Sequence, residues 1–290
     1  MTVPLGAAKR ATELAVADSG AGQGQIEFLN GSYVKENKAI TDGINSPADV
    51  YYDSEDNLYV ANYAGPYVTE YNKKRALSFT YSSQLTDPIS VTTDASNNVY
   101  VADNGGVASA SGVVVEYPQD SNTPVAMCAT GLQNTGIAVD ENGNVFVAGI
   151  NYNIGDPPVT SIILEYKGRL KGCKPTILGV KLVYSAGMRI DNKGDLAVCD
   201  QNSTPPAVEI IPPPYKSIKS TIASRYPYFP YHVAFTKSYT LIFIVEAYIT
   251  VSGAHTNVLV DHYPSGKNVT TLGSSNGLTL PTGVAALPPV

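Results

Sequence analysis

The sequence of 290 residues contains no tryptophan, three cysteines and three methionines, and only 15% of its residues are charged. It has no apolar run near the ~18 residues of a membrane helix, and residues 1–20 lack the apolar segment of a signal peptide. Net charge is −6, and the one basic cluster is Lys73-Lys74-Arg75. The positive surface of a nucleic-acid binder is therefore missing, and we expect neither nucleic acid nor a membrane as a partner.

Motifs of several enzyme classes are also absent. The sequence has no CxxC or Cys/His spacing for zinc, no GxSxG elbow, no phosphate-binding loop and no dinucleotide fingerprint. Cys199 falls in a core-facing strand pattern, which predicts a buried, inert thiol. Cys128 and Cys173 occupy corresponding outer regions of adjacent repeats, so both free thiols and a disulfide stay open.

A repeated hairpin dominates what is present. Its clearest copy is 136–149 (GIAVDENGNVFVAG), in which two β-branched runs flank a turn of Asp, Asn and Gly. Related hairpins occupy 49–62, 90–103, 187–200 and 232–246. Tight turns join their strands at 54–57, 95–98, 141–144 and 192–195, and Pro212-Pro213-Pro214 is expected to mark a turn into an outer strand.

The repeat spacing predicts the fold. Equivalent first-strand positions 49, 90, 136, 187, 232 and 283 are 41 to 51 residues apart, a period typical of propeller blades with four strands. A third strand follows each hairpin and carries a carboxylate, which we interpret as a structural group linking blades: Glu27, Glu70, Glu116, Glu165, Glu209 and Asp261. We therefore expect an all-β, six-bladed β-propeller with four-stranded antiparallel blades.

The two termini are predicted to complete one blade. Glu13–Asp18 (ELAVAD) matches a second strand with no first strand before it, and Pro281–Leu287 (PTGVAAL) is a first strand with no partner after it. Residues 25–30 and 34–40 would be the third and outer strands of this closing blade. The expected organisation is a flexible leader over 1–11 and one propeller domain over 12–290.

The repeat P-x-G-(I/V)-x-(V/I)-D-x-x-G-(N/D)-(L/V)-x-V-A-D resembles the NHL and SMP-30-type six-bladed propellers along essentially the whole chain. The resemblance implies the fold strongly and the function weakly, because propellers host hydrolases, lyases, binding modules and scaffolds. In SMP-30-like lactonases some ligands of a divalent cation such as calcium lie one residue before the first-strand glycine. The matching residues here are not carboxylates or carboxamides: Ala48, Ile89, Thr135, Ala186, Tyr231 and Thr282.

Long connections gather on the face opposite the tight turns, where the first strands begin and the second strands end. They span 104–111, 150–160, 201–206, 225–231 and 247–256, and they carry many tyrosines. Variable loops on a rigid scaffold are where binding groups concentrate, and tyrosine offers contact area at low entropy cost. Candidate binding tyrosines are Tyr63, Tyr152, Tyr228, Tyr231 and Tyr248, although each ring has packing over the loops as an alternative role.

Departures from the repeat supply further candidates at the channel mouth. Asp49, Ser90 and His232 stand where other repeats have glycine, and Asn62, Asp103 and Glu246 end second strands. The second-strand acids, Asp18 and Asp200 included, have capping of loop N–H groups as their structural interpretation. Amidating and streptogramin-type lyases resembling this pattern use histidines near the channel, so Asp49, His232 and His255 are the candidate acid/base group.

These observations favour a binding or interaction module of NHL-like type, with a small molecule or a protein or peptide bound on the tyrosine-rich face and no cofactor. The alternative is a lactonase or other hydrolase, or a lyase, at the same mouth, and only that alternative involves a divalent cation. We expect a monomer. An exported mature form, extracellular or periplasmic, is favoured by the composition, with the cytoplasm as the alternative.

Overall fold

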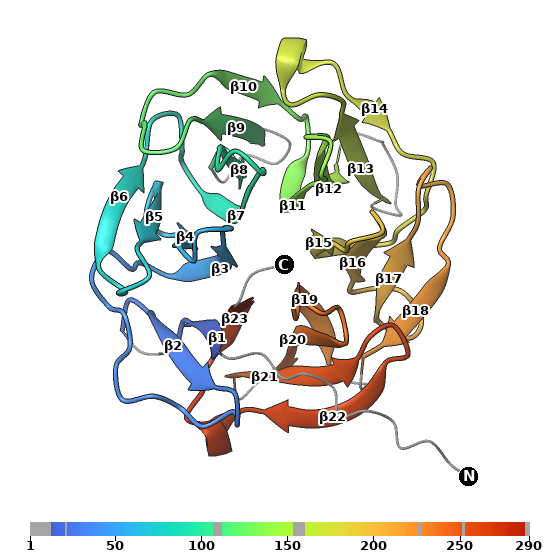
Figure 1. The fold of residues 1–290 in the computed structure, drawn as a ribbon. Coiled ribbons are helices and arrows are strands. Elements are labelled where there is room, and N and C mark those ends of the chain that lie inside the picture. Colours follow the sequence, from blue (N-terminus) through green and yellow to red (C-terminus); the bar gives the residue numbers. More distant parts are fainter. Residues whose placement is uncertain are drawn as a thin grey trace.

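A computed structural model describes residues 13–20, 22–106, 112–152, 160–224, 228–250 and 253–287. These residues form six antiparallel β-sheets arranged as blades around a central channel (Figure 1). The predicted six-bladed β-propeller is thus confirmed. Helix within these ranges amounts to two short 3-10 segments, η1 (Lys171–Cys173) and η2 (Ser274–Asn276), and neither is long enough to cross a membrane.

Five blades follow one another along the chain, numbered 2 to 6, with the innermost strand first. Blade 2 contains β3 (Pro47–Tyr52), β4 (Leu58–Asn62), β5 (Tyr67–Tyr71) and β6 (Leu77–Tyr81). Blade 3 contains β7 (Pro88–Thr93), β8 (Val99–Asp103), β9 (Val113–Tyr117) and β10 (Ala126–Ala129). Blade 4 contains β11 (Gln133–Val139), β12 (Val145–Asn151), β13 (Thr160–Tyr166) and β14 (Thr176–Ile177). Blade 5 contains β15 (Ser185–Ile190), β16 (Leu196–Asp200), β17 (Ala207–Ile211) and β18 (Ser220–Ala223). Blade 6 contains β19 (Phe229–Phe235), β20 (Leu241–Thr250), β21 (Gly253–His262) and β22 (Lys267–Leu272).

Blade 1 joins the two ends of the chain as predicted. β1 (Glu13–Asp18) pairs with both β2 (Gln25–Asn30) and β23 (Pro281–Leu287), and the register with β23 runs from Glu13 opposite Leu287 to Asp18 opposite Pro281. The predicted outer strand 34–40 is reduced to isolated bridges at Lys35 and Ile40. The proposed leader, 1–11, lies outside the described residues.

The turn acids explain why the hairpins form. Asp140 Oδ1 accepts hydrogen bonds from the backbone N–H groups of Asn142 (2.9 Å) and Asn144 (2.7 Å). Gly143 between them has a φ of 74°, which glycine adopts without strain. The same bonds recur at the equivalent carboxylates Asp53, Asp94 and Asp191. Pro212–Pro214 likewise lies in the turn between β17 and β18.

The hydrophobic core is divided into six clusters, each packed between two neighbouring blades. Tyr59, Tyr81 and Tyr117, for example, pack together between blades 2 and 3. The blades are also linked covalently, because Cys128 of β10 and Cys173 of η1 form a disulfide between blades 3 and 4. Cys199 is buried and unpaired, as predicted.

The third-strand carboxylates mostly serve their own blades, which corrects part of the prediction. Glu70 accepts from Ser78 and Tyr81, and Glu209 accepts from Thr221, all within one blade. Glu116 is the one with a described bond to the next blade, through Arg169 of blade 4. Their structural role stands, but groups of the same blade bond Glu27, Glu70, Glu209 and Asp261.

Candidate functional site

The innermost strands supply two layers of side chains to the channel, because residues i and i+2 of a strand face the same side. One layer contains positions 49, 90, 136, 187, 232 and 283, and the next contains 51, 92, 138, 189, 234 and 285. Most of these residues are small. Four polar side chains of these layers meet at one point, and they are Asp49, Ser90, Arg189 and His232.

Asp49, which has no exposed surface, is the centre of that meeting point. It accepts hydrogen bonds from Ser90 Oγ (2.7 Å) and from Arg189 Nη2 (2.7 Å). The N–H groups of Val50 (2.8 Å) and Val91 (3.2 Å) also donate to it. Arg189 further donates to the Val50 carbonyl, at 3.0 Å. Burial alone would raise the pKa of Asp49, but the guanidinium charge and these hydrogen bonds hold it below its ordinary value.

His232 is the fourth member. Its Nδ1 lies 3.3 Å from Asp49 Oδ1, and its side chain is 9% exposed. Burial, together with the nearby Arg189 charge, lowers the pKa of His232 below 6.5 despite the attraction of Asp49. At neutral pH the contact is therefore one between a neutral imidazole and a carboxylate, and the ion pair of the site is Asp49 with Arg189.

These four residues separate two cavities at opposite ends of the channel. His232 lines a cavity of about 360 Å³ on the long-loop face, which we call the long-loop cavity. Arg189 lines a cavity of about 540 Å³ on the face of the tight turns, which we call the short-turn cavity. Asp49 lies buried between them.

The long-loop cavity has aromatic and neutral polar walls. Tyr63, after β4, and Tyr184, before β15, line it from blades on opposite sides of the ring (Figure 1), and Tyr231 lies beside His232. Outside the lining, Tyr152 donates to Gln133 Oε1 at 2.8 Å. Burial and the hydrogen-bonded Tyr152 raise the pKa of Tyr184 to about 12. Tyr184 is thus a neutral hydroxyl group at physiological pH.

The six residues directly before the first-strand positions, where the resemblance to SMP-30-like lactonases implies some metal ligands, line this cavity. They are Ala48, Ile89, Thr135, Ala186, Tyr231 and Thr282. Hard divalent cations need several carboxylate, carboxamide or carbonyl oxygens, and these side chains supply no carboxylate or carboxamide. In the described part of the chain no three His, Cys, Asp or Glu residues are grouped to hold a metal. The residues present do not fit such an ion.

The second-strand acids cap loops, in agreement with their structural interpretation. Asp103 Oδ2 accepts the N–H groups of Thr86 (2.7 Å) and Asp87 (2.9 Å), and Asn62 Oδ1 accepts that of Asn45 (2.8 Å). Glu246 is fully buried, opposite Pro230 in the register of β19 and β20. None of these three side chains lines the long-loop cavity.

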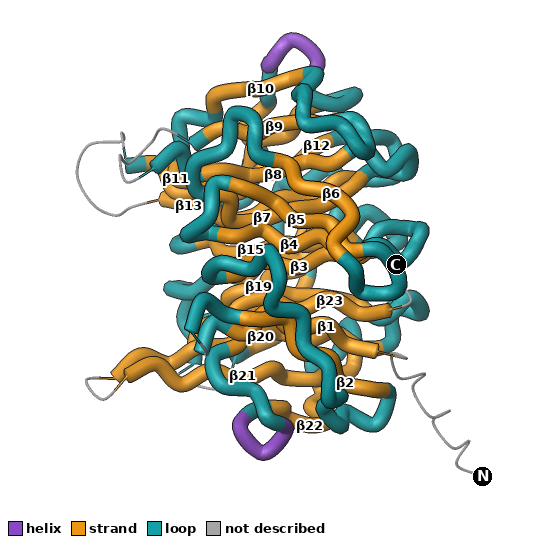
Figure 2. The backbone as a smooth tube through the Cα atoms, turned by 90° about the vertical axis from the view of Figure 1, so that its left-hand side faces the viewer, coloured by secondary structure: helices purple, strands orange, loops and turns teal. Residues whose placement is uncertain are grey.

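Tyr248 and His255 lie on the β20–β21 hairpin, which projects beyond the other blades at the lower left of Figure 2, and Tyr228 lies directly before β19. The rings of Tyr228 and Tyr248 are 5.8 Å apart, and His255 stacks on Tyr248 at 6.5 Å. His255 is paired with Tyr248 along the hairpin, whereas His232 is paired with Val245. The structure thus joins Asp49 to His232 and gives His255 a different partner.

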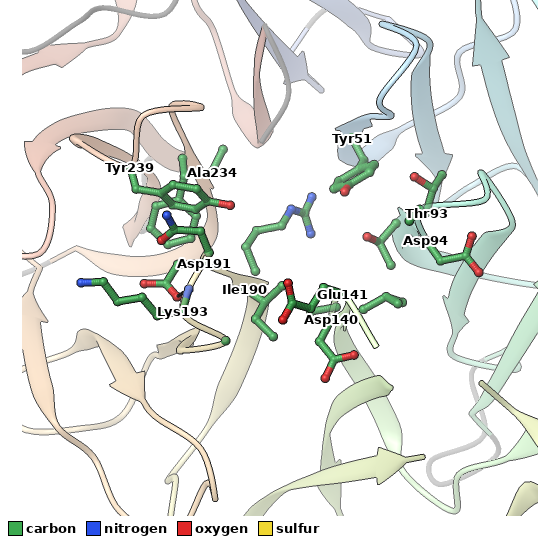
Figure 3. Close-up of a pocket in the computed structure, with 18 of the residues that line it drawn as sticks. Tyr51, Thr93, Asp94, Asp140, Glu141, Ile190, Asp191, Lys193, Ala234 and Tyr239 are labelled. Carbon is green, nitrogen blue, oxygen red and sulfur yellow. Dashed lines mark hydrogen bonds between the residues drawn. The ribbon is translucent and has the colours of Figure 1, made fainter. Parts of the chain in front are cut away.

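The short-turn cavity contains none of the predicted binding residues. Figure 3 shows Asp94, Asp140, Glu141, Asp191 and Lys193 around it, with Tyr51 and Tyr239 on opposite sides. The three aspartates are the turn acids described above, so their oxygens are already used by turn N–H groups. The cavity arises because the short turns of blades 2 to 6, together with the end of β23 in blade 1, leave a wide funnel between them.

Sequence reasoning missed Arg189, although a signal was present. Arg189 occupies one of six equivalent positions, each two residues after the repeat glycine. The other five hold uncharged residues, which are Tyr51, Thr92, Ala138, Ala234 and Ala285. A single charge at that position implies an opposite charge nearby, and Asp49 is the one charged residue of the adjacent layer. Tyr184, directly before β15, and Gln133, at the start of β11, gave no comparable signal, because both positions lie outside the repeated motif.

Comparisons with known proteins agree on the fold alone. No protein-family model matches the chain, and no curated protein sequence matches it. A Bacteroides caccae protein of unknown function is similar in structure, with a TM-score of 0.68 and 12% identity over 96% of this chain and 99% of that one. Kuenenia stuttgartiensis hydrazine synthase is similar with a TM-score of 0.57 and 12% identity, over 82% and 69%. The resemblance to NHL and SMP-30-type proteins is not confirmed as a family relationship.

Proposed function

We propose that this propeller is a binding module of NHL-like type that takes a small molecule, or a short stretch of a partner peptide, in the long-loop cavity. The observation that carries the proposal is a concave site of about 360 Å³ at the channel mouth, walled by Tyr63, Tyr184 and Tyr231. Small-molecule sites commonly measure about 300–1,000 Å³ and combine apolar walls with a few polar groups.

A fragment screen by ligand-observed NMR on the full chain tests this proposal. Fragments that bind should do so about tenfold more weakly to Tyr63→Ala and Tyr231→Ala, since each ring contributes roughly one hot-spot contact. Ile177→Ala, on the exposed strand β14, is the matched control. Binding that is unaffected by both tyrosine substitutions would place the ligand elsewhere and overturn the proposal.

A hydrolase or lyase at the same mouth is the second candidate, favoured by the contact between Asp49 and His232. A neutral imidazole beside an ionised carboxylate is suited to general base catalysis. A panel of lactones assayed with and without EDTA, followed by His232→Ala on any substrate that is turned over, tests this candidate. Turnover that survives the substitution rejects it.

We further infer an extracytoplasmic location, extracellular or periplasmic, and a monomeric state. The disulfide between Cys128 and Cys173 suits an oxidising compartment. Size-exclusion chromatography with light scattering checks the monomer, and fractionation of the native host checks the location.

A further inference from the structure

The described lining of the long-loop cavity contains no charged side chain, although acidic residues are frequent around it in the sequence. Among the described residues that line it, the polar groups are amides, hydroxyls and the imidazole of His232. Three nearby carboxylates, Asp18, Asp103 and Asp200, accept loop N–H groups and do not line the cavity. The acidic positions of the repeat therefore stabilise loops and add no charge to the cavity wall.

The charge of Asp49, beneath the cavity floor, is compensated from the far side of the channel. Arg189 reaches it from blade 5, and this guanidinium is itself 8% exposed and lines the opposite cavity. The carboxylate also accepts hydrogen bonds from Ser90 Oγ and from two backbone N–H groups. A ligand in the long-loop cavity consequently meets neither a free carboxylate nor a free guanidinium at this point.

His232 lies against this pair. Its Nδ1 is buried and is 3.3 Å from Asp49 Oδ1, although it makes no hydrogen bond within the described part of the chain, so the carboxylate acts on the ring through its charge. A carboxylate opposite one ring nitrogen favours the tautomer with the proton on that nitrogen, which leaves the other as an acceptor. The ring lines the cavity, so Nε2 is the nitrogen available to a ligand.

Gly187 keeps the imidazole in this place. A Cβ atom at position 187 would lie 2.4 Å from His232 Nδ1 and 2.6 Å from the Tyr231 carbonyl oxygen. Any larger residue would push the ring away from Asp49. The close approach of β15 to β19 is therefore part of the geometry that aims the histidine.

We propose that Asp49 and Arg189 are positioning residues that hold His232 as a neutral hydrogen-bond acceptor, so that the long-loop cavity selects an uncharged ligand donating an N–H or O–H group to Nε2. This inference rests on the proposed binding function and narrows it to one ligand class. A charged ligand would lose its hydration in a cavity whose described lining offers no counter-charge, which is costly.

The tautomer is measurable without any ligand. The chain has three histidines, so ¹⁵N NMR of the ring nitrogens, assigned with His255→Gln and His262→Gln, resolves His232. We expect a neutral ring at pH 7 with the proton on Nδ1. An imidazolium, or a ring protonated on Nε2, would overturn the inference whatever the protein binds.

Ligand selection is tested with isosteric fragments that differ in charge, such as benzamide, benzoate and benzamidine, within the NMR screen. The relevant fragments are neutral, donate a hydrogen bond, and bind more weakly to the Tyr63→Ala and Tyr231→Ala variants. They should bind the wild type at least about tenfold more tightly than their charged isosteres do. Charged isosteres, or neutral fragments without a donor, that bind this cavity equally well would overturn the inference and leave the binding function standing. If no fragment responds to the tyrosine substitutions, both proposals fail.

A substitution should weaken the expected preference. In the paired variant Asp49→Asn/Arg189→Met the negative charge beside Nδ1 is removed, so the proton is no longer held on that nitrogen and ligands that accept a hydrogen bond gain affinity relative to donors. The pairing avoids leaving Arg189 buried without its partner. Unchanged ring ¹⁵N signals and unchanged fragment preference in the folded variant would show that Asp49 does not set the tautomer.

Discussion

Arg189 of β15 and Asp49 of β3 form a 2.7 Å ion pair that joins opposite blades across the channel (Figure 1). Blades of a propeller otherwise contact their immediate neighbours, as the six interblade clusters show. The pair connects residues 140 positions apart in sequence. It is thus a long-range contact whose loss affects the whole ring.

Removing one partner should be more harmful than removing both. Arg189→Met leaves a fully buried carboxylate without its counter-charge, and we expect a loss of about 3–5 kcal/mol in the free energy of unfolding. Asp49→Asn/Arg189→Met, which removes both charges, should recover a large part of this loss. Urea denaturation measures both variants, and a single variant within about 1 kcal/mol of the wild type would contradict the assigned role.

His232 should make stability depend on pH in mildly acidic solution. Burial and Arg189 lower its folded-state pKa below 6.5, so the unfolded chain takes up a proton before the folded chain does. Its contribution is complete above about pH 6.5 and is lost as the pH falls toward the folded pKa, with a slope of at most about 1.4 kcal/mol per pH unit.

Thermal or urea unfolding between pH 7.5 and 5 compares the wild type with His232→Gln. The substitution should flatten the curve over this window, while the other two histidines are common to both proteins and cancel. Parallel curves would show that the folded pKa of His232 is not depressed.

The disulfide should be detectable by counting thiols. Unfolded, unreduced protein should expose one reactive thiol, Cys199, and reduced protein should expose three. Cys128→Ser/Cys173→Ser should lose about 2–4 kcal/mol of stability, because the bond closes a long loop in the unfolded chain. Three thiols before reduction, or a variant as stable as the oxidised wild type, would argue against the bond.

Closure of blade 1 should be essential for folding. Deleting residues 281–290 removes β23, exposes the edge of β1 and opens the ring, so we expect loss of the cooperative unfolding transition. Deleting residues 1–11 is the matched control, and the proposed leader role predicts an unchanged melting temperature. Circular dichroism melting curves of both truncations make the comparison, and a cooperative transition without β23 would contradict the closure.

The fold could be predicted because the repeat depends on interactions between residues that are close together in the sequence. Asp140 and its equivalents fix the turns through bonds within five residues, and the match between the two termini follows from counting strands. Such signals need no knowledge of the rest of the molecule. The outer strand 34–40 was harder, since edge strands depend on packing more than on pattern, and the structure retains only two bridges there.

The candidate site could be predicted in part. Asp49, Ser90 and His232 were found because they depart from the repeat. Such a departure does not indicate which other residue the side chain contacts. The pairing of Arg189 with Asp49 can be inferred only when blades 2 and 5 are known to face each other across the channel, and that knowledge requires the geometry of the ring. Tyr248 and His255, also predicted at the mouth, are paired along the β20–β21 hairpin and do not line the long-loop cavity.

The cluster around Asp49 lies between two cavities that have no lining residue in common, so the propeller offers two separate cups at opposite ends of its channel. Nothing that enters one cup has to be compatible with the other, so their linings can diverge independently while the cluster between them is kept. Altering the ligand preference of one side by substitutions at its rim should accordingly leave the opposite side intact, provided that the cluster itself is left alone.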